Sequence, residues 1–191
     1  ILTDASVVVV AVIDTGIRYT HEDLNDNMWV NTDEIPNNGV DDDANGVVDD
    51  IYGANFGEKQ EDVDQDRGIV GDPMDLMVTP AAGNGTHVSG IIAATGNNGV
   101  GMAGVSWNAK IMAVKTFSKG GISTASATID GMNYALENGA DVVNASYGGY
   151  MPSRSEQDAM RDLQTAGIVF VATAGNDQNN NDQINVYPAG Y

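Results

Sequence analysis

The segment at residues 7–13 constrains the fold of this chain most. Six of its seven residues are β-branched and none is polar. A strand that is apolar on both faces is typical of a parallel sheet with helices on each side. The segment ends at Asp14, and ligands and catalytic groups gather at the carboxyl ends of strands in open α/β sheets. Asp14 is therefore either a functional carboxylate or a residue that forms a turn or caps a helix.

The rest of the chain alternates between predicted helices and predicted strands. We expect helices at residues 86–95, 124–138 and 155–166, and strands at 110–116, 140–146 and 167–173. A long polar and acidic excursion separates the first strand from the first helix, ending near residue 83. This order predicts the α/β class, as a three-layer, mostly parallel sheet with helices on both faces. Without an internal repeat or a linker, residues 1–191 are expected to form one domain.

The composition excludes several classes of partner. The chain has 27 acidic and 8 basic residues, a net charge of −19, so it repels nucleic acid and anionic membranes. No apolar run approaches the roughly 20 residues that a membrane-spanning helix needs. Cysteine is absent, which excludes disulfides and thiol chemistry.

The acidic excursion has the composition of a cation site. Residues 33–66 hold twelve acidic residues and one basic residue. Within them, residues 41–46 match the opening D-x-D-x-N-G of a calcium loop, although Tyr52 stands where such a loop needs a bidentate Glu. Asp49 or Asp50 would have to close the site instead. We expect Ca²⁺ to be bound, and the alternative is a solvated acidic loop. The predicted ligands are Asp41, Asp43, Asn45, Val47 and Asp50.

A glycine motif at residues 99–104 spells G-x-G-x-x-G. The dinucleotide-binding fingerprint must follow a strand and open a helix. This copy follows a predicted helix and precedes a strand, so it has no helix N-terminus to hold a pyrophosphate. We therefore do not expect nucleotide binding.

One of the two histidines, His87, lies at the start of a predicted helix of small residues. Small residues allow a helix to pack tightly on a sheet and to hold a side chain in place. An isolated histidine is usually a satisfied surface or core residue, and His21, in polar surroundings, fits that description. For His87 the pattern favours chemistry, because an acid at one strand end (Asp14) occurs together with Asn176 at the end of another.

Four motifs of this chain resemble those of the subtilisin-like serine proteases, the subtilase family, in the same order. They lie at residues 12–17, 85–90, 146–149 and 174–176. The resemblance covers essentially the whole chain and implies the first two-thirds of a subtilisin-like catalytic domain, with its C-terminal part absent. The family's nucleophile lies in a Gly-Thr-Ser-Met-Ala motif that does not occur here, and none of the nine serines has that context. This chain alone is therefore expected to be inactive.

The resemblance also implies roles for individual residues. His87 would be the general base, Asp14 would orient its imidazole, and Asn176 would donate to the oxyanion. Two edge segments would pair with an extended substrate through backbone hydrogen bonds. They are Gly121, Ile122 and Ser123 in one segment, and Ser146, Tyr147 and Gly148 in the other.

A second calcium site is implied by the same resemblance. It would be formed by Asp23 with the loop after the first helix, through Gly96, Asn98, Val100 and Met102. The family further implies a secreted or extracytoplasmic location, a peptide or protein substrate, and association with a pro-region and the absent C-terminal segment. The leading hypothesis is thus a calcium-stabilised serine endopeptidase that lacks its nucleophile segment. The alternative is a non-catalytic module that binds peptides or calcium.

Overall fold

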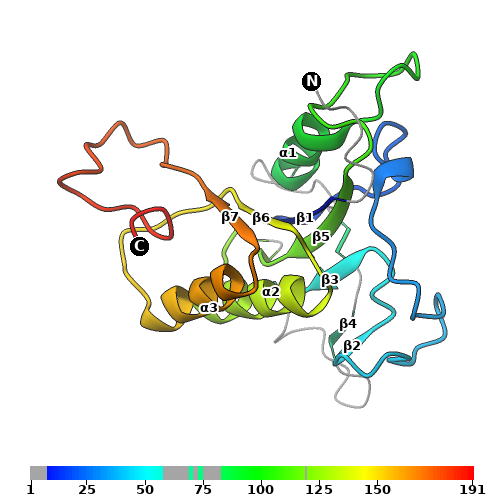
Figure 1. Cartoon of the computed structure of the whole chain (residues 1–191), viewed down its shortest axis with the longest axis horizontal. Coiled ribbons are helices and arrows are strands. Elements are labelled where there is room, and N and C mark those ends of the chain that lie inside the picture. The colour runs from blue at the N-terminus through cyan, green and yellow to red at the C-terminus, as the bar shows by residue number, and fades with distance from the viewer. Residues whose placement is uncertain (1–7, 58–68, 71–72, 75–82, 119) are drawn as a thin grey trace.

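The computed structural model describes residues 8–57, 69–70, 73–74, 83–118 and 120–191, so Val7 of the first predicted strand lies outside the described residues. Their helices and strands follow one another along the chain (Figure 1). In order they are β1 (Val9–Asp14), the 3₁₀ helix η1 (Asn25–Asn27), β2 (Val47–Val48), β3 (Gly53–Asn55), β4 (Ile69–Val70), α1 (Asn84–Ala93), β5 (Lys110–Lys115), α2 (Ala125–Glu137), β6 (Val142–Ala145), α3 (Arg154–Thr165) and β7 (Val169–Ala172).

Five strands form one sheet in the order β3-β5-β1-β6-β7, and every pair of neighbours is parallel. The strand β1 is central, with Asp14 opposite Lys115 of β5 and Ile13 opposite Ala145 of β6. Because all five strands run the same way, their carboxyl ends meet at one edge. We call this the carboxyl edge.

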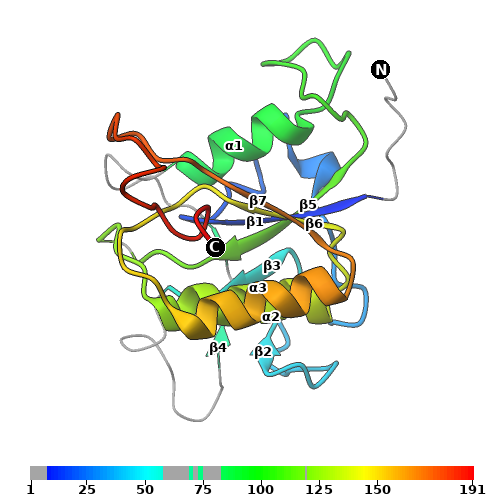
Figure 2. The ribbon, with the colours of Figure 1, turned by 60° about the vertical axis from the view of Figure 1, so that its left-hand side comes forward.

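The two faces of β1 pack against different helices. Ala11 and Ile13 are fully buried in a core that includes residues of α2 and α3. Val10 and Val12 belong to a second core that contains Ala93 of α1. Figure 2 shows the same division, with α1 on one side of the sheet and α2 and α3 on the other. The predicted three-layer α/β fold is therefore confirmed.

The structure departs from the sequence prediction in the acidic excursion. The short strand β3 lies there and pairs with β5, although its sequence Gly-Ala-Asn carries no strand pattern. A Cβ on Gly53 would lie 1.8 Å from the carbonyl oxygen of Ala113, so the pairing of β3 with β5 requires a residue without a side chain at this position. A second, two-stranded sheet joins β2 and β4. Within the described ranges, no helix is long and apolar enough to cross a membrane.

The first turn of α1 packs tightly against the end of β1. A Cβ added to Gly85 would lie 2.3 Å from the carbonyl oxygen of Gly16 and 3.1 Å from the Cβ of Asp14. The N–H of Gly85 donates to Thr15 Oγ1 at 3.3 Å, and the N–H of Arg18 donates to Thr86 Oγ1 at 2.9 Å. These contacts fix the position of the helix relative to the carboxyl edge.

This close contact predicts that Gly85→Ala destabilises the protein. The added methyl group meets backbone, which has little freedom to move, so we expect a loss of roughly 1–3 kcal/mol in the free energy of unfolding. Gly90→Ala in the same helix is the matched control, because a Cβ there meets nothing within 4 Å. Helix propensity alone predicts that the control gains up to about 1 kcal/mol. Urea unfolding followed by circular dichroism measures both, and equal effects would contradict the tight contact.

Candidate active site at the carboxyl edge

Asp14 ends β1 and is only 3 % exposed. Its Oδ1 accepts a hydrogen bond of 2.7 Å from the N–H of Thr15. The residues of β1 alternate between the two faces of the sheet, so Asp14 follows Val10 and Val12 on the side of α1. The carboxylate is therefore placed under the first turn of that helix.

The side chain that meets the Asp14 carboxylate from α1 is Asn84, the first residue of the helix. With its amide nitrogen facing the acid, Asn84 donates to Asp14 Oδ2 at 2.6 Å and to Oδ1 at 3.2 Å. The opposite orientation would place the amide oxygen against carboxylate oxygens, two acceptors facing each other. Asn84 is therefore the hydrogen-bond donor that covers this acid.

Asn84, and not His87, is the side chain of α1 that hydrogen-bonds to Asp14 in the described structure, so the predicted acid–imidazole pair stays a prediction. The buried residues of α1 are Gly85, Ser89 and Ala93, spaced four apart along the face toward the sheet. His87 is exposed and lies about 200° around the helix from Gly85, on the side of the exposed Ile91. His87 is therefore one turn further along α1 than Asn84 and about 60° around the helix from it.

The other histidine is also engaged elsewhere. His21 Nδ1 accepts a hydrogen bond of 3.1 Å from the N–H of Asp23. The helix was predicted to start at residue 86, two residues late, so Asn84 was not recognised as a site residue. The position of Asn84 in the sequence could have indicated its role. When a helix follows a strand that ends in an acid, the first residues of the helix lie nearest that acid.

The two predicted substrate segments follow the strands on either side of β1. Residues 121–123 come after β5, where the N–H of Ser118 donates to the carbonyl of Ile122 at 2.9 Å and the Ile122 side chain is 70 % exposed. Residues 146–148 come directly after β6. The rings of Phe117 and Tyr147 pack edge to face with centroids 6.3 Å apart, and Phe117 forms an antiparallel bridge with Ser123, so the ends of β5 and β6 are joined.

Asn176 lies four residues after β7, and it is exposed. Its neighbour Asp177 accepts a hydrogen bond from the hydroxyl of Tyr150, which follows β6. Gly149 and Tyr187 form an antiparallel bridge with N–H to carbonyl distances of 2.8 and 2.9 Å. The chain after β7 is therefore tied to the end of β6, and Asn176 belongs to the same carboxyl edge.

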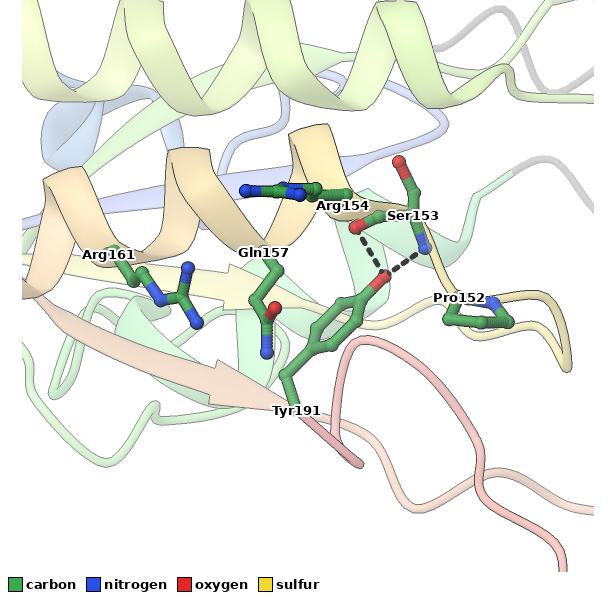
Figure 3. Close-up of a pocket in the computed structure, with 6 residues that line it drawn as sticks. All are labelled: Pro152, Ser153, Arg154, Gln157, Arg161 and Tyr191. Carbon is green, nitrogen blue, oxygen red and sulfur yellow. Dashed lines mark hydrogen bonds between the residues drawn. The ribbon is translucent and has the colours of Figure 1, made fainter.

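A cavity of about 490 Å³ lies near the start of α3 (Figure 3). Its lining residues are Pro152, Ser153, Arg154, Gln157, Arg161 and Tyr191. The Tyr191 hydroxyl accepts from the N–H of Ser153 at 2.6 Å and contacts Glu156 Oε2 at 3.0 Å. None of the predicted site residues lines this cavity, so it is separate from the Asp14 site.

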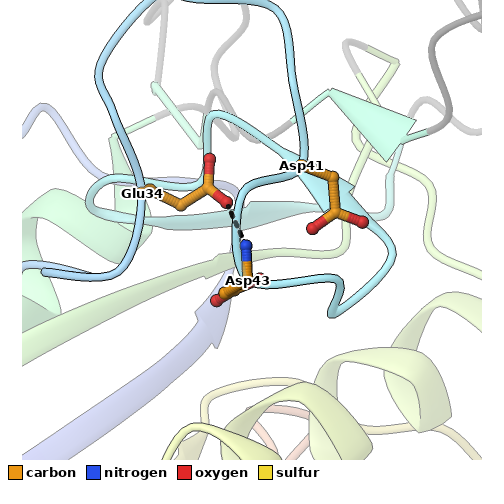
Figure 4. A group of neighbouring side chains, drawn as sticks. All are labelled: Glu34, Asp41 and Asp43. Atoms are coloured by element: carbon orange, nitrogen blue, oxygen red, sulfur yellow. Dashed lines mark hydrogen bonds between the residues drawn. The ribbon is translucent and has the colours of Figure 1, made fainter.

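Three carboxylates of the acidic excursion gather in one place (Figure 4). Glu34, Asp41 and Asp43 each offer an oxygen, and these oxygens lie within 4.8 Å of one another. Oxygens around a single Ca²⁺, at 2.3–2.6 Å from the ion, span up to about 5 Å, so this donor set fits a calcium ion. Asn45 adjoins the group, with its Nδ2 3.0 Å from Asp43 Oδ2. Glu34 was missed because it precedes the recognisable motif by seven residues.

Asp50, predicted to close this site, lies beneath it instead. Its side chain is fully buried, and it accepts hydrogen bonds from Tyr134 of α2, from Asn45 at 3.0 Å and from Asn31 at 3.1 Å. Burial raises the pKa of Asp50 above its ordinary value. Val47 is also buried, as part of β2. Asp50 therefore anchors the excursion to α2, and the structure does not bring it into the carboxylate group.

Comparison with known proteins identifies the family. A model described as the Subtilase family matches residues 5–191. This chain belongs to the subtilase family. It is 38 % identical over 172 residues to Subtilisin-like protease 1 of Plasmodium vivax, which covers 90 % of this chain and 25 % of that protein. It is 34 % identical over 184 residues to the Halolysin-like extracellular serine protease Nep of Natrialba magadii, covering 96 % of this chain and 28 % of that protein.

The solved structures agree with the sequence match. A crystal structure of a cold adapted subtilisin-like serine proteinase superimposes with a TM-score of 0.64 and 25 % identity, over 95 % of this chain and 50 % of that one. The subtilase chain thus spans about a quarter of the length of the relatives named above, and half of the solved structure.

The second calcium site that the family resemblance implies is assembled only in part. The structure brings Asp23 to the loop after α1, as predicted, but the groups facing its carboxylate are N–H donors. Asn98 Nδ2 donates to Oδ1 at 2.8 Å, and the N–H of Met102 donates to Oδ2 at 2.9 Å. Asn98 Oδ1 accepts from the N–H of Val100 at 3.1 Å. These amides satisfy the acid in this structure, and a cation at this site stays a prediction.

The subtilase's Asp23 predicts a pH-dependent contribution to stability. The Met102 N–H, and after it the Asn98 amide, hold the pKa of Asp23 below its ordinary value of 3.8. A lowered pKa adds stability above the unfolded value, and this stability is lost as the pH falls through the folded value. Asp23→Asn should therefore lower the free energy of unfolding at pH 7, and the difference from wild type should shrink below about pH 4.

Urea unfolding between pH 7 and pH 3 measures this difference. Glu22→Gln, at the exposed neighbouring position, is the control and should cost little across the range. A difference for Asp23→Asn that does not change with pH would show that the charge of Asp23 is not what stabilises the loop.

Proposed function

We propose that this subtilase chain binds an extended peptide or protein segment across the carboxyl edge of its sheet. This proposal rests on the positions of two segments, 121–123 and 146–148, which lie on either side of Asp14 after the two strands that flank β1. An extended peptide placed there has backbone edges to pair with, the usual way in which a strand is added to a protein. The relatives are named as proteases, which supports a polypeptide as the ligand.

Hydrolysis of the bound peptide is the second candidate function, favoured by membership of a protease family. In that case His87 acts as general base, Asp14 orients it, and Asn176 donates to the oxyanion, where such a donor contributes about 10²–10³ in kcat in subtilisin. The reaction also needs a nucleophilic serine, and no Gly-Thr-Ser-Met-Ala motif occurs in the 191 residues. The contact of Asn84, and not of His87, with Asp14 favours binding over hydrolysis.

We further propose that Ca²⁺ binds the group of Glu34, Asp41 and Asp43, and that it stabilises the excursion by offsetting the repulsion among these acids. An extracytoplasmic location is supported by the Natrialba magadii relative, whose name describes an extracellular protease. The family resemblance adds a pro-region and the rest of a subtilase catalytic domain as further partners of this chain.

Peptide binding is tested with fluorescein-labelled casein, followed by fluorescence anisotropy and competed by a ten-residue casein peptide. The two segments lie on opposite sides of the bound peptide, so its alternate N–H groups point to one segment or the other. N-methylation of alternate residues in either frame should therefore weaken competition at least about tenfold, since two lost hydrogen bonds of about 1 kcal/mol each exceed the 1.4 kcal/mol of a tenfold change. The unmethylated peptide is the control.

Two outcomes count against the proposed binding. One is the absence of any anisotropy change at high protein concentration. The other is undiminished competition by both methylated peptides, which would show that strand-like pairing is not involved. Release of small labelled fragments during the same incubation would favour the endopeptidase instead.

Calcium binding predicts that EDTA lowers the melting temperature. At a concentration 100 times its Kd, one bound ion adds about 2.7 kcal/mol to the free energy of unfolding. Asp43→Ala should remove most of this dependence, whereas Asp182→Ala, at an exposed site outside the group, should leave it intact. Differential scanning calorimetry with and without Ca²⁺ measures the effect. Identical melting curves for the wild-type protein in both conditions would leave the cluster as a solvated acidic loop.

A further inference from the structure

We propose that residue 84 is the position from which a general base would act with Asp14, and that Asn84 leaves this domain able to hold a peptide without cleaving it. This inference rests on the proposed peptide binding, and it names the residue that decides whether a bound peptide is cleaved. The residue is the first one of α1, where the proton acceptor that cleavage needs is absent.

Residue 84 has the geometry that a base acting with Asp14 would need. A general base paired with a carboxylate must hydrogen-bond to it, because that bond sets the orientation of the base. Among the described side chains, Asn84 makes this contact from α1, at 2.6 and 3.2 Å from the two oxygens of Asp14. Asn84 is itself exposed, so its other side is open toward the carboxyl edge where the peptide would lie. The position therefore links the buried acid to the exposed edge.

An asparagine at this position cannot act as the base. A general base takes the proton of the attacking hydroxyl and later gives it to the leaving amine. The amide nitrogen of asparagine donates hydrogen bonds, but its lone pair is delocalised into the carbonyl group and accepts no proton near neutral pH. Asn84 therefore makes the contact with Asp14 that a general base would make, but it cannot take or give the proton. In subtilisin, loss of the base alone lowers kcat by about 10⁶-fold.

His87 does not occupy this position in the described structure. It lies three residues after Asn84, about 60° around the helix and about 4.5 Å further along its axis, and it is exposed. To take the place of Asn84 on Asp14, it would need a rotation and a shift of α1. The first turn of the helix is held by the bond from Gly85 to Thr15 and by the bond from Arg18 to Thr86. A rotation would break both and would drive the helix backbone into Gly16, which already lies against Gly85.

The experiment introduces an imidazole at residue 84 and titrates each histidine by NMR. In Asn84→His, the introduced imidazole should have a pKa raised by roughly 1 to 3 pH units, since a carboxylate lies within hydrogen-bonding distance. Adding Asp14→Asn should bring this pKa back toward the ordinary value of about 6.5. In the protein that keeps Asn84, the single substitution Asp14→Asn should leave the titration of His87 unchanged.

Two results would overturn the inference. A fall in the pKa of His87 on Asp14→Asn would show that His87, and not residue 84, pairs with the acid. An introduced imidazole that does not respond to Asp14→Asn would show that residue 84 does not face it. Casein cleavage by the wild-type protein that is lost in His87→Gln would also overturn it.

A second pair of variants tests the same geometry without removing Asp14. Asn84→Asp places a carboxylate against the Asp14 carboxylate, so one member of the pair should titrate well above the usual range of an aspartate. His87→Asp, on the exposed face, is the matched control and should titrate normally. Normal titration in both variants counts against residue 84. These titrations need no peptide, so a failure of casein to bind would remove the proposed function and leave the assignment of residue 84 standing.

Discussion

The contact between the first turn of α1 and the end of β1 organises the carboxyl edge. Because Gly85 has no side chain, the helix comes within van der Waals distance of the turn after Asp14. This approach buries Asp14 and sets which residues of the helix face it. Asn84 lies on the acid, and His87, three residues later, is exposed and one turn further along the helix.

In the acidic excursion, the carboxylates lie close together and repel one another. Backbone N–H groups offset part of this repulsion, since the Glu34 carboxylate accepts hydrogen bonds from the N–H of Asp42 at 2.7 Å and from the N–H of Asp49 at 3.1 Å. The buried Asp50 attaches the excursion to α2 through Tyr134. A cation among Glu34, Asp41 and Asp43 would complete this arrangement, because only a positive charge compensates three neighbouring carboxylates in full.

Regular elements were predictable from the sequence where a single local pattern decided them. The strands β1, β5, β6 and β7 are runs of apolar residues, and each lies within two residues of its predicted bounds at both ends. The strand β3 was not predictable, because it is a strand only through its pairing with β5. The start of α1 was placed two residues late, and that small error hid Asn84. A boundary error of this size matters here because the decisive side chain is the first one of the helix.

The sequence by itself determined the class of fold and the family, since both depend on patterns that are continuous along the chain: apolar runs, small-residue helices and short motifs in order. It also determined that the catalytic acid of the resemblance ends a buried strand. Only the tertiary structure decided which side chain meets that acid, because this depends on the rotation of α1 about its own axis. Only the structure brought Glu34 to Asp41 and Asp43, since folding of the excursion joins residues that no spacing rule connects.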